Sequence, residues 1–194
     1  MTQPSTDGTG TAQGAAYARS ARLIHWTMAA LILSTIPVGF LMVQDGLPRR
    51  VQNALFIYHK NVGVLLLLLI ALRIAYRFAV SPPPLPHHMP HWQARAAGLS
   101  HLALYALMVV MPVAGYVRVR AGGFPIEVLD CLGAPSLVPR SDALAEIAKT
   151  VHYYSAFILT AFVLLHISAA VHHGLIRRDG VFSRMWPGAD RLAR

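Results

Sequence analysis

The sequence has few charged residues and a single cysteine. Charged side chains make up 13% of its 194 residues, whereas hydrophobic residues make up 55%. The lone Cys131 excludes a disulfide framework, a cysteine-rich metal site and the C-x-x-C-H attachment of c-type haem. This scarcity of charge, together with a mean hydropathy of +0.48, indicates a membrane protein.

Acidic residues are especially scarce, which leaves a net charge of +9. The basic residues flank apolar runs and form no stripe with interleaved aromatic residues, so they indicate membrane topology and not nucleic-acid binding. Residues 1–16 (MTQPSTDGTGTAQGAA) lack the basic and apolar regions of a signal peptide and predict a disordered tail. Residues 17–194 are expected to form one domain.

Four apolar segments follow the tail, at about residues 23–43, 56–78, 99–117 and 151–171. Each is close to the roughly 20 residues that a helix needs to cross a bilayer, and only helices satisfy their own backbone there. The sequence therefore predicts an all-α fold, a transmembrane four-helix bundle. The long connection at 118–150 contains a short helical pattern, DALAEIAK, and is expected to cap the outer face.

The basic residues are distributed unequally between the two ends of this bundle. The end with both termini and the second connection carries ten (Arg19, Arg22, Arg73, Arg77, Arg95, Arg177, Arg178, Arg184, Arg191 and Arg194). The opposite end carries seven (Arg49, Arg50, Lys60, Arg118, Arg120, Arg140 and Lys149). By the positive-inside rule, both termini are expected in the cytoplasm.

Histidines interrupt the apolar segments. His152 and His166 lie in the run VHYYSAFILTAFVLLHISAAVHHG, where ionisable groups are costly and usually functional. Fourteen residues rise about 21 Å along a helix and return to within about 40° of the same face. His25 opens the first segment from the cytoplasmic side and His59 opens the second from outside. Depth therefore groups His25 with His166, and His59 with His152.

Two histidine pairs at two depths are what a bundle needs to hold two haems, each clamped between facing helices. A single histidine of this kind is as readily explained by an interfacial position or a hydrogen bond between helices. The matched depths of all four favour haem ligation.

The same step of fourteen residues places other candidates at these two levels. Gly39 follows His25 by fourteen and would let a flat macrocycle approach at the outer level. Gly63, one turn from His59, is expected to play the same part. Arg73 follows His59 by fourteen, at the inner level, where its guanidinium would pair with a haem propionate.

Three further histidines lie in the last two apolar segments or at their cytoplasmic ends. His101 is a rival inner ligand, although its position nearer the interface favours a role beside the ligands or at a quinone site. His172 and His173 either cap the last helix or donate protons at a quinone pocket, since histidine titrates near neutral pH.

With these residues in place, the chain resembles the bacterial cytochrome b561 family of four-helix, di-haem membrane cytochromes. The matching motifs, which span almost the whole chain after the tail, are RLIHW (22–26), YHKNVG (58–63), GLSHLALY (98–105), TVHYYSA (150–156), LLHISAAVHHGLIRRDG (164–180) and RMWPG (184–188). The resemblance implies two non-covalent b haems, with His25 and His166 as ligands of the inner haem and His59 and His152 as ligands of the outer haem. It also implies a multi-pass protein of the bacterial inner membrane.

Members of this family pass electrons between a donor outside the membrane and the quinone pool, and one branch oxidises superoxide and reduces ubiquinone. The resemblance thus implies an oxidoreductase with a periplasmic one-electron donor, for which Lys60, Arg118 and Arg120 are candidate steering cations or ordinary interfacial anchors. Related cytochromes instead serve as haem subunits that dock a soluble dehydrogenase or hydrogenase. A proton or ion transporter with a histidine relay is the alternative from another class, and it predicts a colourless protein.

Overall fold

The computed structural model describes residues 16–84 and 89–188, and these ranges contain helices and no strand. The helices are α1 (Arg19–Leu41), α2 (Arg49–Ala79), α3 (His91–Ala121), α4 (Glu127–Cys131) and α5 (Asp142–Val171). A π-helical turn, η1 (His172–Arg177), continues α5, and a 3₁₀ turn, η2 (Ser183–Met185), follows it. The predicted tail lies outside the described residues except for Ala16.

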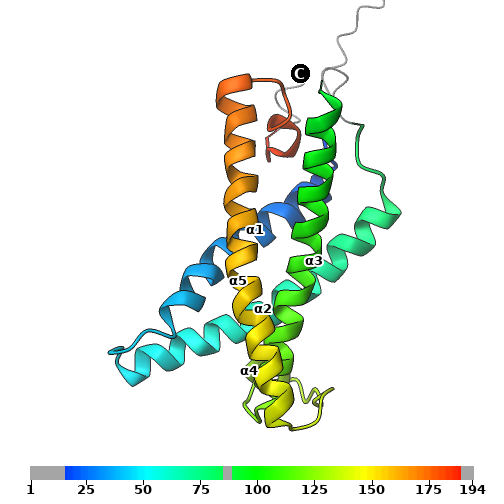
Figure 1. The fold of residues 1–194 in the computed structure, drawn as a ribbon. Coiled ribbons are helices and arrows are strands. Elements are labelled where there is room, and N and C mark those ends of the chain that lie inside the picture. The colour runs from blue at the N-terminus through cyan, green and yellow to red at the C-terminus, as the bar shows by residue number, and fades with distance from the viewer. Residues whose placement is uncertain (1–15, 85–88, 189–194) are drawn as a thin grey trace, which may run out of the picture.

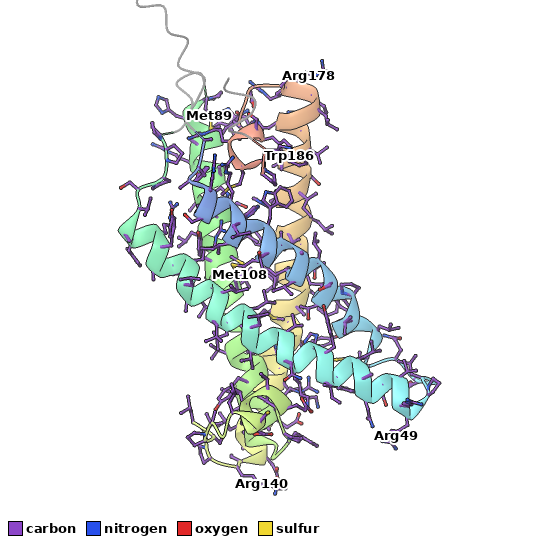
Figure 2. The ribbon with its side chains drawn as sticks, turned by 180° about the vertical axis from the view of Figure 1, so that it is seen from behind. Arg49, Met89, Met108, Arg140, Arg178 and Trp186 are labelled. Carbon is purple, nitrogen blue, oxygen red and sulfur yellow. The ribbon has the colours of Figure 1, made fainter. Side chains whose placement is uncertain are left out.

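The four long helices form two hairpins that cross each other. Helix α1 packs against α2, α3 against α5, and α2 against α3. In both views α1 and α2 run obliquely across α3 and α5 (Figures 1 and 2). Helix α4 lies at the end of the bundle where α3 ends and α5 begins (Figure 1). Both hairpins therefore contribute side chains to the centre of the bundle.

All four long helices are long and apolar enough to cross a membrane. Their outer faces expose large apolar side chains, including Leu68, Phe78, Leu102 and Leu164, which would be unfavourable in water and suit contact with lipid. The prediction of an all-α transmembrane four-helix bundle is confirmed.

The helices extend beyond the apolar segments that predicted them. Helix α2 begins at Arg49 and α3 begins at His91, each about two turns before the apolar run. The DALAEIAK pattern is not a separate capping helix but the first turns of α5. Ser141 caps that helix, and its Oγ accepts a hydrogen bond from the Leu144 amide at 3.3 Å. Hydropathy marks the part of a helix that contacts lipid, whereas caps and turns set where it ends.

Both ends of the described chain lie at the same end of the bundle. The Tyr17 amide donates a hydrogen bond to the Arg184 carbonyl at 3.1 Å. An even number of spans requires this arrangement. Placement of that end in the cytoplasm stays a prediction from the loop charges.

Candidate functional site

The outer pair consists of His59 on α2 and His152 on α5. Their ring centroids lie 6.0 Å apart, with the ring planes at 78°. Both side chains are half-buried. Nδ1 of His152 lies 3.0 Å from the Met111 carbonyl of α3. Because a carbonyl only accepts, Nδ1 carries the proton and donates it, and Nε2 keeps its lone pair for a ligand.

A cavity of about 310 Å³ adjoins this pair. All four long helices line it, and its size falls in the range of about 300–1,000 Å³ that is usual for small-molecule and cofactor sites. Its wall is mostly apolar and includes the outer histidines, Gly39 and Gly63, while Arg118 and Lys149 are its cations. Met108, another lining residue, lies near the middle of the bundle (Figure 2).

The inner pair consists of His25 on α1 and His166 on α5. Their ring centroids lie 6.2 Å apart, with the planes at 72°. The ring of His101 on α3 also lies near His166, at 5.6 Å and 66°. His25 and His166 are half-buried, whereas His101 is exposed. The structure thus brings the predicted inner pair together and leaves His101 as its more exposed neighbour.

Both separations fit a metal ion held between two imidazoles. Two imidazole nitrogens that bind one metal from opposite sides, each at about 2.0–2.1 Å, place their ring centroids about 6 Å apart. The observed 6.0 Å and 6.2 Å agree with this geometry. The apolar cavity gives room at the outer level for a flat organic group. The residues therefore fit a haem clamped between facing histidines.

Arg73 lies at the inner level, as its spacing predicts. Its charge acts on both His25 and His166. The Arg73 Nε donates a hydrogen bond to the Tyr105 hydroxyl of α3 at 3.1 Å, and the guanidinium carbon lies 5.8 Å from the centre of that ring. Tyr105 thus holds the cation beside the inner pair, a role that the sequence did not reveal.

Two of the three candidate steering cations form ion pairs with α4. Lys60 lies 2.7 Å from the carboxylate of Glu127, and Arg120 lies 2.7 Å from that of Asp130. These carboxylates offset the positive charge that a donor outside would meet. Arg118 differs, because its side chain lines the outer cavity.

The same contacts hold α4 against the turn of α2 that carries His59. The Asn61 side chain donates to Glu127 at 3.3 Å and accepts from the Val128 amide at 3.0 Å. Burial raises the pKa of Glu127, but hydrogen bonds from Lys60 and Asn61 and the Lys60 charge outweigh it, so this pKa lies below its ordinary value. Glu127 is therefore ionised at neutral pH and clamps α4 in place.

The two terminal histidines have different surroundings. His172 is exposed, whereas His173 is half-buried and its Nδ1 lies 2.6 Å from the Asp179 carboxylate. Burial raises the pKa of Asp179, but hydrogen bonds from His173 and the Val181 amide, together with the charge of Arg177, hold it below its ordinary value. The structure therefore orients His173 through a carboxylate.

The C-terminal segment, residues 178–188, packs on the inner end of the bundle. Arg184 is buried, and its Nη2 donates to the carbonyls of Pro83 and Pro84 at 3.0 and 2.7 Å. These bonds tie the segment to the connection between α2 and α3. The RMWPG motif contributes to the family resemblance, but its sequence does not predict this structural role.

The same segment also contacts the start of α1. The Arg22 guanidinium donates to the Trp186 carbonyl at 3.0 Å, and the Trp26 indole donates to the Met185 carbonyl at 2.8 Å. The Trp26 ring lies edge-on to the ring of His25, with centroids 5.6 Å apart. Trp186 is seen at this end of the bundle in Figure 2. The segment therefore packs against the first turns of α1, which carry His25.

Glycines lie against the outer histidine rings. A Cβ atom at Gly39 of α1 would lie 2.8 Å from Cε1 of His59, and one at Gly115 of α3 would lie 3.1 Å from Cε1 of His152. A Cβ atom at Gly63 would meet nothing within 4 Å. Gly39 thus makes room for an imidazole, Gly115 does the same without having been predicted, and Gly63 lines the cavity without this constraint.

A membrane-spanning four-helix bundle with facing histidines at two levels belongs to the class of haem-carrying membrane proteins. The family model described as prokaryotic cytochrome b561 matches residues 16–188. The chain belongs to the prokaryotic cytochrome b561 family. It is accordingly a multi-pass protein of the bacterial inner membrane that takes part in electron transport, and the family implies haem b.

Curated relatives cover most of the chain. Cytochrome b561 homolog 2 of Escherichia coli is 30% identical over 83% of this chain and 86% of its own length. Cytochrome b561 homolog 1 of the same organism is 26% identical over 84% and 93%. Probable superoxide oxidase CybB of Yersinia pestis is 24% identical over 84% and 92%.

Proposed function

We propose that the chain is a di-haem cytochrome that carries electrons across the membrane, with His59 and His152 as ligands at the outer level and His25 and His166 at the inner level. The observation that carries this proposal is the pair of centroid separations, 6.0 Å and 6.2 Å, both of which suit a metal ion between two imidazoles.

Haem bound at these levels would supply one-electron redox chemistry. The chain supplies ligation, orientation and a medium of low dielectric. Helix α5 gives one ligand at each level, and Arg73 offers a positive charge to a carboxylate at the inner level. The C-terminal segment packs against α1 at the inner end, and α4 packs against the turn of α2 that carries His59.

The donor side of this path is the outer end, and a quinone at the cytoplasmic end is the acceptor. Superoxide suits the donor role because one relative is named a probable superoxide oxidase and because the cation Arg118 lines the outer cavity. Two superoxide ions would each release one electron and become dioxygen. One ubiquinone would take up these two electrons and two protons and become ubiquinol.

His173 is suited to deliver protons at the inner end. It follows His166 by seven residues and lies in the π-helical turn η1, at the same end of the bundle as the inner pair. Its contact with Asp179 fixes the ring and holds a proton on Nδ1. His172, which is exposed, is assigned no part in this step.

Spectroscopy of the purified protein tests the proposal. We expect a b-type signal in the reduced-minus-oxidised absorption spectrum and a haem content of two per chain. A colourless protein would support a histidine relay in a transporter, and one haem per chain would contradict the two-level assignment.

Replacement of single histidines separates the inner ligand from its rival. His166→Gln should remove one haem and leave the outer one, whereas His101→Gln should retain both because the exposed His101 is not a ligand. Haem content and the low-temperature absorption bands give the readout. If His101→Gln loses the inner haem and His25→Gln retains it, His101 is the inner ligand and His25 is its neighbour.

Stopped-flow mixing with superoxide tests the donor. We expect rapid reduction of the protein, followed by reoxidation when a ubiquinone analogue is present. Absence of reduction by superoxide in a fully loaded protein would favour the alternative, a haem subunit that receives electrons from a docked dehydrogenase or hydrogenase.

A further inference from the structure

The two outer histidines rest on the neighbouring helices in matching ways. His152 of α5 lies against Gly115 of α3, and a Cβ atom there would approach its ring to 3.1 Å. The carbonyl that accepts the Nδ1 proton belongs to Met111, four residues before that glycine. The ring thus lies along one helical turn, with a missing side chain at one end and an acceptor at the other.

The other ring repeats this arrangement on α1. His59 lies against Gly39, where a Cβ atom would approach its ring to 2.8 Å. The backbone of Thr35, four residues before that glycine, lies beside the ring without forming a hydrogen bond of good geometry, and Nδ1 of His59 is buried with no other partner in the described chain. The Thr35 carbonyl is therefore the nearby backbone acceptor for this nitrogen.

We propose that Gly39 with the Thr35 carbonyl, and Gly115 with the Met111 carbonyl, are two backbone seats that position the outer histidines and set the strength of their bonds to iron. The proposal rests on the haem-binding function proposed above. In each seat the glycine admits the ring. The Met111 carbonyl accepts the Nδ1 proton of His152, and the proposal assigns the Thr35 carbonyl the same part toward His59. Nε2 then points its lone pair toward the cavity.

The physical reason is the effect of this hydrogen bond on the imidazole. A histidine ligand that donates its second N–H to a carbonyl is fixed in tautomer and orientation, and it is also a stronger base toward the metal. Loss of such a partner typically costs about 10–100-fold in metal affinity. Weaker donation by the ligand favours the reduced iron and raises the midpoint potential.

The two seats share a local distortion of the helix that forms them. Each includes a proline, Pro37 between Thr35 and Gly39 and Pro112 directly after Met111. A proline interrupts the helical hydrogen bonds and bends the helix locally. In both helices this bend lies where a ring from a neighbouring helix must reach the backbone.

Alanine substitutions at three glycines test the seats. Gly39→Ala and Gly115→Ala place a methyl group against a ring, whereas Gly98→Ala adds the same group at an exposed position of α3, outside the cavity, where it meets nothing within 4 Å. Alanine favours helix over glycine, so none of the three changes disfavours the helical fold. The inner haem serves as an internal control for folding.

We expect Gly39→Ala and Gly115→Ala to weaken outer haem binding about 10–100-fold and to raise the midpoint potential of the haem that remains. Gly98→Ala should leave both unchanged. Haem content, potentiometric titration and electron paramagnetic resonance of the oxidised protein give the readouts. If all three variants match the wild type, the seats are refuted while the haem function stands; a wild type without outer haem would refute the proposed function itself.

Discussion

Arg73 places a positive charge within the apolar run of α2, at the level of the inner pair. A nearby cation favours the reduced and less positive iron. Arg73→Gln should therefore lower the midpoint potential of the inner centre, and Tyr105→Phe, which keeps the charge but removes the hydrogen bond at 3.1 Å, should lower it less. Redox titration followed at the two sets of absorption bands measures both. A shift confined to the outer centre would contradict this placement of Arg73.

At the scale of single residues, helical spacing predicts depth well. A step of fourteen residues relates His152 to His166 and places Gly39 beside the outer pair, where the structure has it. The same step from His101 leads to Gly115, which the sequence does not single out because His101 is not one of the four paired histidines. Spacing gives the level of a residue, but the ring that lies against it depends on how the helices cross.

Tyr105 shows that spacing within one helix does not predict contacts between helices. Its hydroxyl meets Arg73 only because α2 and α3 pack together, and no spacing within either helix reveals that contact.

At the scale of elements, the packing of α4 against α2 depends on the charge of Glu127. The pKa of Glu127 lies below its ordinary value of 4.5 in the folded protein, so its clamp stabilises the fold above that value and is lost as the pH falls through the folded pKa. Glu127→Gln should lower thermal stability by less than about 1 kcal/mol at neutral pH, because the carboxylate is partly exposed. The difference from wild type should vanish in acid.

Thermal unfolding in detergent between about pH 3 and pH 7 measures this difference. Glu146→Gln is the matched control, since Glu146 pairs with Lys149 at 3.0 Å on an exposed face of α5. If both substitutions lower the stability equally, or if the effect of Glu127→Gln grows in acid, Glu127 does not hold α4 in place.

The ends of the elements are what the sequence predicted least well. The apolar segments locate all four spans, yet the first turns of α2, α3 and α5 are polar enough to resemble connections. The sequence also did not predict the ion pairs of Lys60 and Arg120. In the Lys60 pair the carboxylate is close in space but far away in the chain, and in both pairs it comes from α4.

At the scale of the whole molecule, the C-terminal segment joins parts that are far apart in sequence. Arg184→Ala should remove two charge-assisted hydrogen bonds at a buried site and cost about 2–4 kcal/mol of stability. Thermal unfolding and the fluorescence of Trp26 and Trp186 report it. Arg50→Ala, on an exposed position of α2, should have little effect. Equal losses in both variants would show that the closure carries no particular stability.

The crossing of the two hairpins has a consequence for assembly. His25 and His59 both come from the hairpin of α1 and α2, while His152 and His166 both come from α5. In the proposed di-haem protein, the first haem to bind, at either level, would link these two parts of the chain. It would also bring the two histidine rings of the other level close together. Binding of the second haem would then cost less conformational entropy, because its two ligands are already close together. Chains supplied with too little cofactor should therefore divide into filled and empty molecules, with few that hold only one.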